Sequence, residues 1–236
     1  MMRALIVDDE IHAREELRAL LEETGEFAIV GSCGNAMEAL REIRTQEPDV
    51  LLLDIQMPGV SGFELLSMID EEIMPNVVFV SAYDEYAVRA FEENALDYLL
   101  KPVQQDRLAK TVRKLKKNLA EGERPIYAGP EIRKLPCVMT NRIKLIGLAE
   151  VEYVRSEPAG VYAVCATGEF FTELTLKVLE NKTSLVHCHK QFLVNLDRVD
   201  EILLQDNLLA EIKTTSGNRV PVSRRYLKKL KQQLGI

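Results

Sequence analysis

Three aspartates stand where short apolar runs of the sequence end. Asp8 and Asp9 follow the run ALIV, and Asp54 follows the run VLLL. If these runs form neighbouring parallel strands, the three carboxylates meet at the carboxyl edge of the sheet, where open α/β sheets bind ligands. Clustered carboxylates repel one another unless they are protonated or neutralised, and oxygen-rich sites suit a hard cation such as Mg²⁺. The sequence therefore predicts a magnesium site.

Two further polar side chains are expected at the same edge. Ser81 ends the run NVVFVS and Lys101 ends the run LDYLLK, so a hydroxyl and a positive charge join the carboxylates. A carboxylate, a metal, a lysine and a hydroxyl together make a phosphoryl-transfer site. Any one acid at a strand end is more often a solvated loop residue, but five positions at one edge favour a built site.

Apolar runs alternate with amphipathic stretches in the first half of the chain. The runs cover residues 3–9, 27–33, 49–54, 76–81 and 96–101. Between and after them, apolar residues recur at spacings of three and four, which places each set on one face of a helix. Strands that alternate with helices of this length indicate right-handed crossovers and a parallel sheet covered on both faces. We expect a flavodoxin-like α/β domain with five parallel strands.

The pattern changes after a segment that mixes charge with Pro and Gly and has no apolar period. Short alternating runs separated by turn residues follow it, which is typical of a mainly antiparallel β domain. Two helical stretches are expected there, at residues 174–181 and 223–234, with Ser223 as the N-cap of the second. We divide the chain into a first domain, a linker and a second domain, at residues 1–118, 119–133 and 134–236.

The charge differs between the two halves. Residues 1–120 carry 13 Lys and Arg against 23 Asp and Glu, a balance of −10, and the remainder carries 17 against 14, or +3. The acidic half argues against nucleic-acid contact, and the mildly basic half permits it.

No apolar run approaches the roughly 20 residues that span a bilayer, and the N-terminus has acids too early for a secretory signal. We expect a cytoplasmic protein with no membrane contact. Its four cysteines, without a C-x-x-C pair, are expected to be reduced and mostly buried.

Four motifs resemble, in order, those of the receiver domain of two-component response regulators: LIVDDE (5–10), LLLDIQMPGVSG (51–62), VFVSAYDEYA (78–87) and DYLLKP (97–102). The resemblance covers roughly residues 1–118 and implies that Asp54 is the phosphoacceptor. It implies that Asp9, Asp54 and the backbone carbonyl of Gln56 hold Mg²⁺. Asp8 would act largely through bound water.

The same resemblance assigns roles in a switch. Lys101 would pair with the phosphoryl oxygens, Ser81 would hydrogen-bond to them, and Pro102 would follow a cis peptide. Tyr98 would be the aromatic residue that turns inward as Ser81 moves. This local change would alter the face made by the fourth helix, fifth strand and fifth helix of the domain. We expect that face to form a homodimer on phosphorylation.

The second half resembles the LytTR DNA-binding domain of LytR/AlgR-type regulators over roughly residues 134–236. The resemblance is carried by HCHKQFLVNL (187–196) and VPVSRRYLKKLK (220–231). In this family, loops from a β core enter successive major grooves. The base-contacting loops map to residues 158–160, to Lys190 and to Arg225.

Lys190 and Arg225 can both reach guanine O6 and N7, Arg in bidentate fashion. Gly160 has no side chain to read a base, so the first loop offers no side-chain base contact at this position. Arg224 and the lysines of the last helix could contact phosphates, and His189 would lie near the DNA loop. A metal site at His187-Cys188-His189 is disfavoured, because in a strand Cys188 points away from both histidines.

These features favour a transcription factor that a sensor histidine kinase phosphorylates on Asp54 and that binds promoter DNA as a dimer. Such a protein is not an enzyme beyond its own phosphorylation and dephosphorylation. One alternative is a phosphorylation-switched receiver whose C-terminal domain binds protein or RNA. Another is a phosphohydrolase with Asp54 as nucleophile, which is disfavoured because Gln56 stands where a second catalytic acid would be needed.

Overall fold

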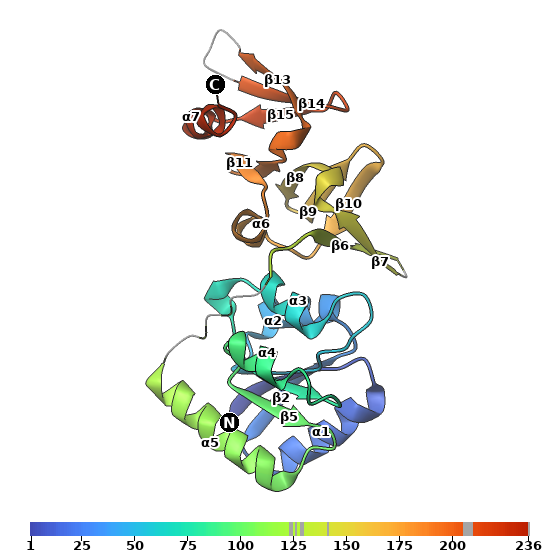
Figure 1. Ribbon diagram of the computed structural model, residues 1–236, viewed down its shortest axis with the longest axis vertical. Coiled ribbons are helices and arrows are strands. Elements are labelled where there is room, and N and C mark those ends of the chain that lie inside the picture. Colours follow the sequence, from blue (N-terminus) through green and yellow to red (C-terminus); the bar gives the residue numbers. More distant parts are fainter. Residues whose placement is uncertain (123–124, 126, 128–129, 141, 205–209, 236) are drawn as a thin grey trace. The chain divides into compact units, whose positions relative to one another are not determined.

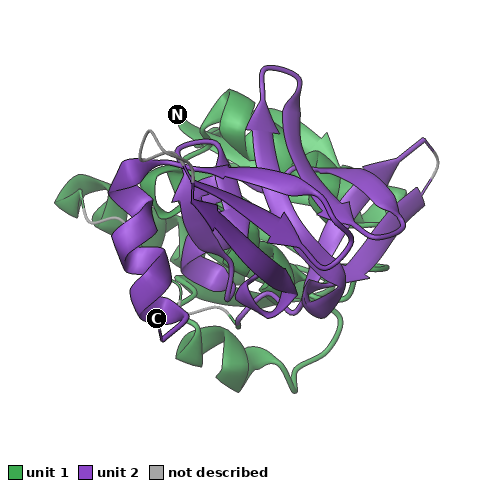
Figure 2. Ribbon diagram, turned by 90° about the horizontal axis from the view of Figure 1, so that it is seen from above, with its two compact units in different colours: residues 1–130 green, residues 131–236 purple. Residues whose placement is uncertain are grey.

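The computed structural model divides into two compact units, residues 1–130 and residues 131–236, which Figure 2 shows in different colours. The structure describes the chain except residues 123–124, 126, 128–129, 141, 205–209 and 236. Several residues of the expected linker therefore lie outside the described part of the chain.

The first unit is built on a parallel sheet whose strand order is β2-β1-β3-β4-β5. The strands are β1 (Met2–Val7), β2 (Phe27–Cys33), β3 (Val50–Leu53), β4 (Asn76–Ser81) and β5 (Asp97–Leu100). This confirms the flavodoxin-like fold predicted from the alternating runs. The central pair is β1 and β3, with Val7 opposite Leu53 at the ends of the two strands. The residues that follow each strand therefore emerge side by side.

Helices cover both faces of this sheet (Figure 1). They are α1 (Ile11–Glu23), α2 (Ala36–Gln46), α3 (Gly62–Met68), α4 (Ala87–Glu92) and α5 (Gln105–Glu121), with a short 3-10 turn, η1, at Glu71–Ile73. On one face, Leu17 of α1 and Leu108 of α5 pack in the core formed with Ile6, Leu52 and Val78 of the strands. The helices α2, α3 and α4 lie on the other face. Burial of these apolar side chains is the main force that assembles the unit.

The first compact unit includes residues that follow residue 118. Helix α5 continues to Glu121. Further along, Tyr127 is only 3% exposed, and its hydroxyl accepts a hydrogen bond of 2.8 Å from the backbone N–H of Val77 at the start of β4. Burial raises the pKa of the Tyr127 phenol. A single aromatic residue thus anchors the segment after α5, and no apolar period marks it in the sequence.

The second unit contains antiparallel strands in three sheets, of orders β10-β9-β8-β12-β11, β13-β14-β15 and β6-β7. The strands are β6 (Lys134–Met139), β7 (Arg142–Gly147), β8 (Val151–Glu157), β9 (Gly160–Cys165), β10 (Gly168–Thr172), β11 (Val186–His189), β12 (Phe192–Val194), β13 (Val199–Leu204), β14 (Ala210–Thr214) and β15 (Arg219–Val222). Helices α6 (Leu176–Lys182) and α7 (Arg224–Gln233) and the 3-10 turns η2 (Leu148–Glu150) and η3 (Leu196–Arg198) complete it. This confirms the predicted mainly β architecture.

A buried glutamate ties two of these sheets together. Glu152 of β8 is 2% exposed and accepts hydrogen bonds from the β14–β15 turn, at 2.6 Å from Thr214 and 3.1 Å from Asn218. Burial alone would raise the pKa of Glu152, but hydrogen bonds from Ser216, Thr214 and Asn218 outweigh it and lower that pKa. The ionised side chain therefore orders the turn and joins β8 to the neighbouring sheet.

All four cysteines are free and buried, as predicted. Among the described residues, no helix is both long enough and apolar enough to cross a bilayer.

A second buried carboxylate fastens α5 to the sheet of the first unit. Asp97 is fully buried and accepts two hydrogen bonds from the Arg107 guanidinium, at 2.7 and 2.5 Å. Thr111 and Lys114 donate to it at 2.7 and 2.9 Å. Burial alone would raise the pKa of Asp97, but hydrogen bonds from Arg107, Lys114 and Thr111 hold it well below its usual range.

The substitution Asp97→Asn should lower the free energy of unfolding of the first unit by about 3 kcal/mol, because it leaves the Arg107 guanidinium without its charged partner. Urea titration of the full chain, followed by hydrogen exchange in β4 and β5, measures this loss. Because the folded pKa is depressed, the stabilisation is present above the ordinary aspartate pKa of about 3.9 and is lost only as the pH falls through the folded value. The difference between wild type and variant should therefore be equal at pH 7 and pH 5.

Lys114→Ala is the matched control, since its side chain is 49% exposed, and we expect a loss below about 1 kcal/mol. Equal losses in the two variants would contradict the central role given to Asp97.

Candidate functional site

The three predicted carboxylates meet at the carboxyl ends of β1 and β3. One oxygen each of Asp8, Asp9 and Asp54 lies within 4.8 Å of the others. Asp8 and Asp54 are 2% and 7% exposed, whereas Asp9 faces solvent. Within the described part of the chain, this is the one group of three acidic, His or Cys side chains close enough to share a metal ion. The cluster therefore has an open side and two buried members.

Lys101, which follows β5, reaches into this cluster. Its Nζ lies 2.6 Å from an Asp8 oxygen and 3.1 Å from Oδ2 of Asp54. Burial raises the pKa of Asp54; Lys101 opposes this and Asp8 adds to it, and the net direction is upward. For Lys101, burial would lower the pKa, but hydrogen bonds and charge from Asp8 and Asp54 outweigh it and raise that pKa. The site holds a charged ammonium beside carboxylates that repel each other.

The backbone fixes the orientation of Asp54. Its N–H donates to the Val7 carbonyl at 2.8 Å, and its Oδ1 accepts from the N–H of Ile55 at 2.7 Å. Helix α3 begins close by at Gly62, where an added Cβ would lie 2.3 Å from the Asp54 carbonyl oxygen. Gly62 therefore permits a close approach that no other residue allows. Oδ2 remains turned toward Lys101.

Ser81 and Tyr98 lie at the same end of the sheet. Ser81, the last residue of β4, is fully buried. Tyr98 is 7% exposed, and its hydroxyl donates to the Tyr83 carbonyl and also contacts the Ser81 side chain. Burial raises the pKa of the Tyr98 phenol. The Tyr98 ring is thus buried at this end of the sheet. The Lys101–Pro102 peptide is cis, as predicted.

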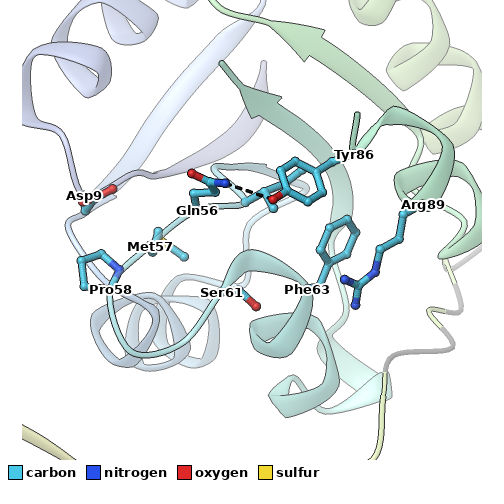
Figure 3. Close-up of a pocket in the computed structure, with 9 residues that line it drawn as sticks. Asp9, Gln56, Met57, Pro58, Ser61, Phe63, Tyr86 and Arg89 are labelled. Atoms are coloured by element: carbon cyan, nitrogen blue, oxygen red, sulfur yellow. Dashed lines mark hydrogen bonds between the residues drawn. The ribbon is translucent and has the colours of Figure 1, made fainter. Parts of the chain in front are cut away.

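A pocket of about 470 Å³ opens beside the acidic cluster. Figure 3 shows that Asp9 and Gln56 line one part of it and that Tyr86, Phe63 and Arg89 line another. The Gln56 side chain donates to the Tyr86 hydroxyl at 3.0 Å, and the Arg89 guanidinium lies 4.1 Å from the centre of the Phe63 ring. Sequence reasoning considered only the backbone carbonyl of Gln56. It missed Phe63, Tyr86 and Arg89, which line the other part of the pocket. The one available signal was Tyr86, which lies in the motif SAYDEYA.

In the second unit, the three predicted contact segments converge. The Ser156 N–H, just before the β8–β9 turn, donates to the Gln191 carbonyl at 2.8 Å. The Ser223 N–H, just before α7, donates to the Cys188 carbonyl at 2.9 Å. These two bonds bring residues 158–160, the Lys190 loop and the start of α7 to one edge of the unit. Lys190, Arg224 and Arg225 are all exposed there.

His189 is held at this edge. Its Nδ1 accepts the backbone N–H of Gln191 at 3.2 Å, so a neutral ring carries its proton on Nε2. The ring also packs edge-on against Phe192, with centroids 5.6 Å apart. Cys188 between the histidines is fully buried, which agrees with the prediction that it points away from them. The His189 ring can therefore present a donor outward.

The backbone at Gly160, in the β8–β9 turn, leaves no room for a side chain that could contact a base. Its φ is +136°, and an added Cβ would lie 2.4 Å from the Phe171 ring. The β8–β9 turn therefore excludes a side chain at this position. Ser223 is the N-cap residue of α7, as predicted, but its side chain makes no capping hydrogen bond.

Comparison with known proteins defines the class. Residues 4–113 match the response regulator receiver domain, and residues 141–235 match the LytTR DNA-binding domain. The chain is 52% identical over 236 residues to an uncharacterized response regulatory protein of Vibrio cholerae, with 100% of both chains covered. It is 47% identical over 239 residues to the transcriptional regulatory protein BtsR of Salmonella typhimurium and 46% identical to BtsR of Escherichia coli, again with 100% of each chain covered.

The chain therefore belongs to the response regulators in which a receiver domain precedes a LytTR DNA-binding domain. It is a DNA-binding transcriptional response regulator, which confirms the class predicted from its motifs. The two domains imply a histidine kinase and DNA as partners.

The substitution Gly62→Ala should destabilise the first unit by about 3 kcal/mol, because the new methyl group must displace the Asp54 backbone rather than a movable side chain. Urea titration of the full chain measures the loss. Gly59→Ala is the matched control: Gly59 has a φ of +82° but nothing within 4 Å of its added Cβ, so only about 1 kcal/mol of backbone strain is expected. Equal losses would argue against the close approach at Asp54.

Proposed function

We propose that Asp54 is the phosphoacceptor of a sensor histidine kinase and that its phosphorylation controls binding of the second unit to promoter DNA. One observation carries the first half: the Lys101 ammonium lies 3.1 Å from Asp54 and 2.6 Å from Asp8 at the sheet edge. In the proposed step, an Asp54 oxygen attacks the phosphorus of a phosphohistidine, the P–N bond breaks, and the imidazole leaves. Lys101 stabilises the negative charge on the phosphoryl oxygens.

The acidic cluster fits Mg²⁺. Three carboxylates and one ammonium leave a net charge of about −2, which one divalent cation neutralises, and carboxylate oxygens are ligands that Mg²⁺ accepts. We assign Asp9, Asp54 and the Gln56 carbonyl as direct ligands and Asp8 as a ligand through water. When bound, the cation neutralises charge on the transferring phosphoryl group.

Ser81 and Tyr98 form the proposed switch. The buried Ser81 hydroxyl would hydrogen-bond to the phosphoryl oxygens, which changes its contact with Tyr98 and so the face formed by α4, β5 and α5. Val88, Phe91 and Leu100 on that face are 70%, 53% and 47% exposed. Exposed large apolar side chains close together favour an interface, so we propose that this face forms a homodimer.

Lys190 and Arg225 are the proposed base readers, and Arg224 and His189 are proposed to contact phosphates. The support is that two separate segments, joined by the hydrogen bond from the Ser223 N–H to the Cys188 carbonyl, place these residues near one another, and that Lys190, Arg224 and Arg225 are exposed. Because its target is chromosomal, we propose that the protein acts in the cytoplasm and that its catalysis is limited to its own phosphorylation and dephosphorylation. We propose residues 1–118 as the receiver domain, residues 119–133 as the linker and residues 134–236 as the LytTR domain.

Wild-type protein incubated with Mg²⁺ and phosphoramidate should gain the mass of one phosphoryl group, and Asp54→Asn should gain none. Intact-protein mass spectrometry measures this. Asp106→Asn is the control, since this exposed aspartate lies in the first turn of α5 and its loss should leave phosphorylation unchanged. Phosphorylation of Asp54→Asn would refute the assignment. A phosphorylated wild type that stays monomeric in light scattering would refute the dimer.

Arg225→Ala should weaken binding to a site selected from a random duplex pool by about 1–3 kcal/mol, because a bidentate contact to guanine is lost. Lys228→Ala should weaken specific and non-specific binding equally and reduce the salt slope by about one. Fluorescence anisotropy over a range of salt concentrations measures both. If no duplex binds at low salt in either phosphorylation state, the second unit binds protein or RNA instead.

A further inference from the structure

Three elements of the second unit meet at one aromatic ring, that of Tyr226 in the first turn of α7. The His187 ring of β11 stacks on it, with centroids 5.5 Å apart and planes 21° from parallel. The Arg225 guanidinium lies 5.5 Å from the centre of the same Tyr226 ring. A guanidinium at this distance from an aromatic ring is attracted to it. The ring therefore restricts the directions that Arg225 can take.

Both nitrogens of the His187 ring face oxygen atoms. Nδ1 lies 3.1 Å from the His189 carbonyl, and because a carbonyl can only accept, this nitrogen carries a proton. Nε2 lies 3.3 Å from a carboxylate oxygen of Glu180 on α6, and the His187 side chain is 14% exposed. The hydrogen bond at Nδ1 and the stacking on Tyr226 together restrict rotation of the His187 ring. Glu180 in turn lies 3.9 Å from Lys229 of α7, so it faces both elements.

The same network lies directly behind both proposed base readers. Lys190 follows the β11 strand that carries His187, and Arg225 adjoins Tyr226. The hydrogen bond from the Ser223 N–H to the Cys188 carbonyl joins the two backbones beside the stacked rings. Any shift of His187 against Tyr226 would therefore change the separation of Lys190 from Arg225. Reading two base positions at once requires this separation to be fixed.

We propose that His187 and Tyr226 are positioning residues that set the DNA sequence specificity of this protein without reading bases themselves. The inference rests on the proposed role of Arg225 as a base reader. Loss of the stacked pair frees Arg225 and weakens binding to the selected site, where its direction matters. Binding to random duplex depends on charge alone and is unaffected.

The test uses the full-length phosphorylated protein and two duplexes, the selected site and a scrambled one, in fluorescence anisotropy over a salt series. Tyr226→Leu keeps an apolar side chain but removes the ring, and His187→Gln removes the other ring. Each should lower affinity for the selected site by about tenfold. Affinity for the scrambled duplex and both salt slopes should stay at wild-type values. Tyr226→Phe keeps the ring and should bind like the wild type.

The outcomes separate this inference from the proposed function. If Arg225→Ala weakens selected-site binding but Tyr226→Leu and His187→Gln do not, Arg225 is a reader and the positioning role is refuted. If Arg225→Ala has no effect, the reader assignment fails and the inference fails with it. A loss in Tyr226→Phe equal to that in Tyr226→Leu would assign the effect to the hydroxyl rather than the ring. If Tyr226→Leu loses affinity equally for the selected and the scrambled duplex, the substitution has damaged the fold. If His187→Gln, which retains polar groups, also loses affinity equally for both duplexes, the proposal is overturned.

Discussion

The repulsion among Asp8, Asp9 and Asp54 is the constraint around which the first unit is organised. Two of these carboxylates are buried, so their charge must be balanced by Lys101 and by whatever the open side binds. The β1–β3 pairing and the position of Lys101 after β5 create this cluster. Buried charges that are only partly compensated respond strongly when charge is added, which suits them to a switch.

Much of the first unit could be predicted because its apolar runs are short, fully buried and bounded by polar residues. The ends of those runs also locate Asp54, Ser81 and Lys101, since parallel strands end at a common edge. The ion-pair network of Asp97 and the anchor at Tyr127 could not be predicted. Both depend on partners 10 to 50 residues away in the chain, and neither leaves a period in the sequence.

The second unit was less accessible to sequence reasoning. Antiparallel strands were evident from alternation, but the order β10-β9-β8-β12-β11 depends on pairings that alternation leaves open. That Gly160 cannot carry a side chain could be recognised only once the position of the Phe171 ring was known. In the same way, the wall formed by Tyr86 and Arg89 depends on how α4 packs near the loop after β3, and the stack on Tyr226 depends on where β11 meets α7.

The anchoring of Tyr127 within the first unit shortens the chain that connects the two units. Tyr127 is hydrogen-bonded within the first unit, and the Ile132 N–H donates to the Lys182 carbonyl within the second. Four residues lie between Tyr127 and Ile132, so the two Cα atoms are five steps apart and separated by at most about 18 Å. The chain between these two hydrogen-bonded residues is therefore short, although the charge, Pro and Gly content of residues 119–133 suggested a longer connection.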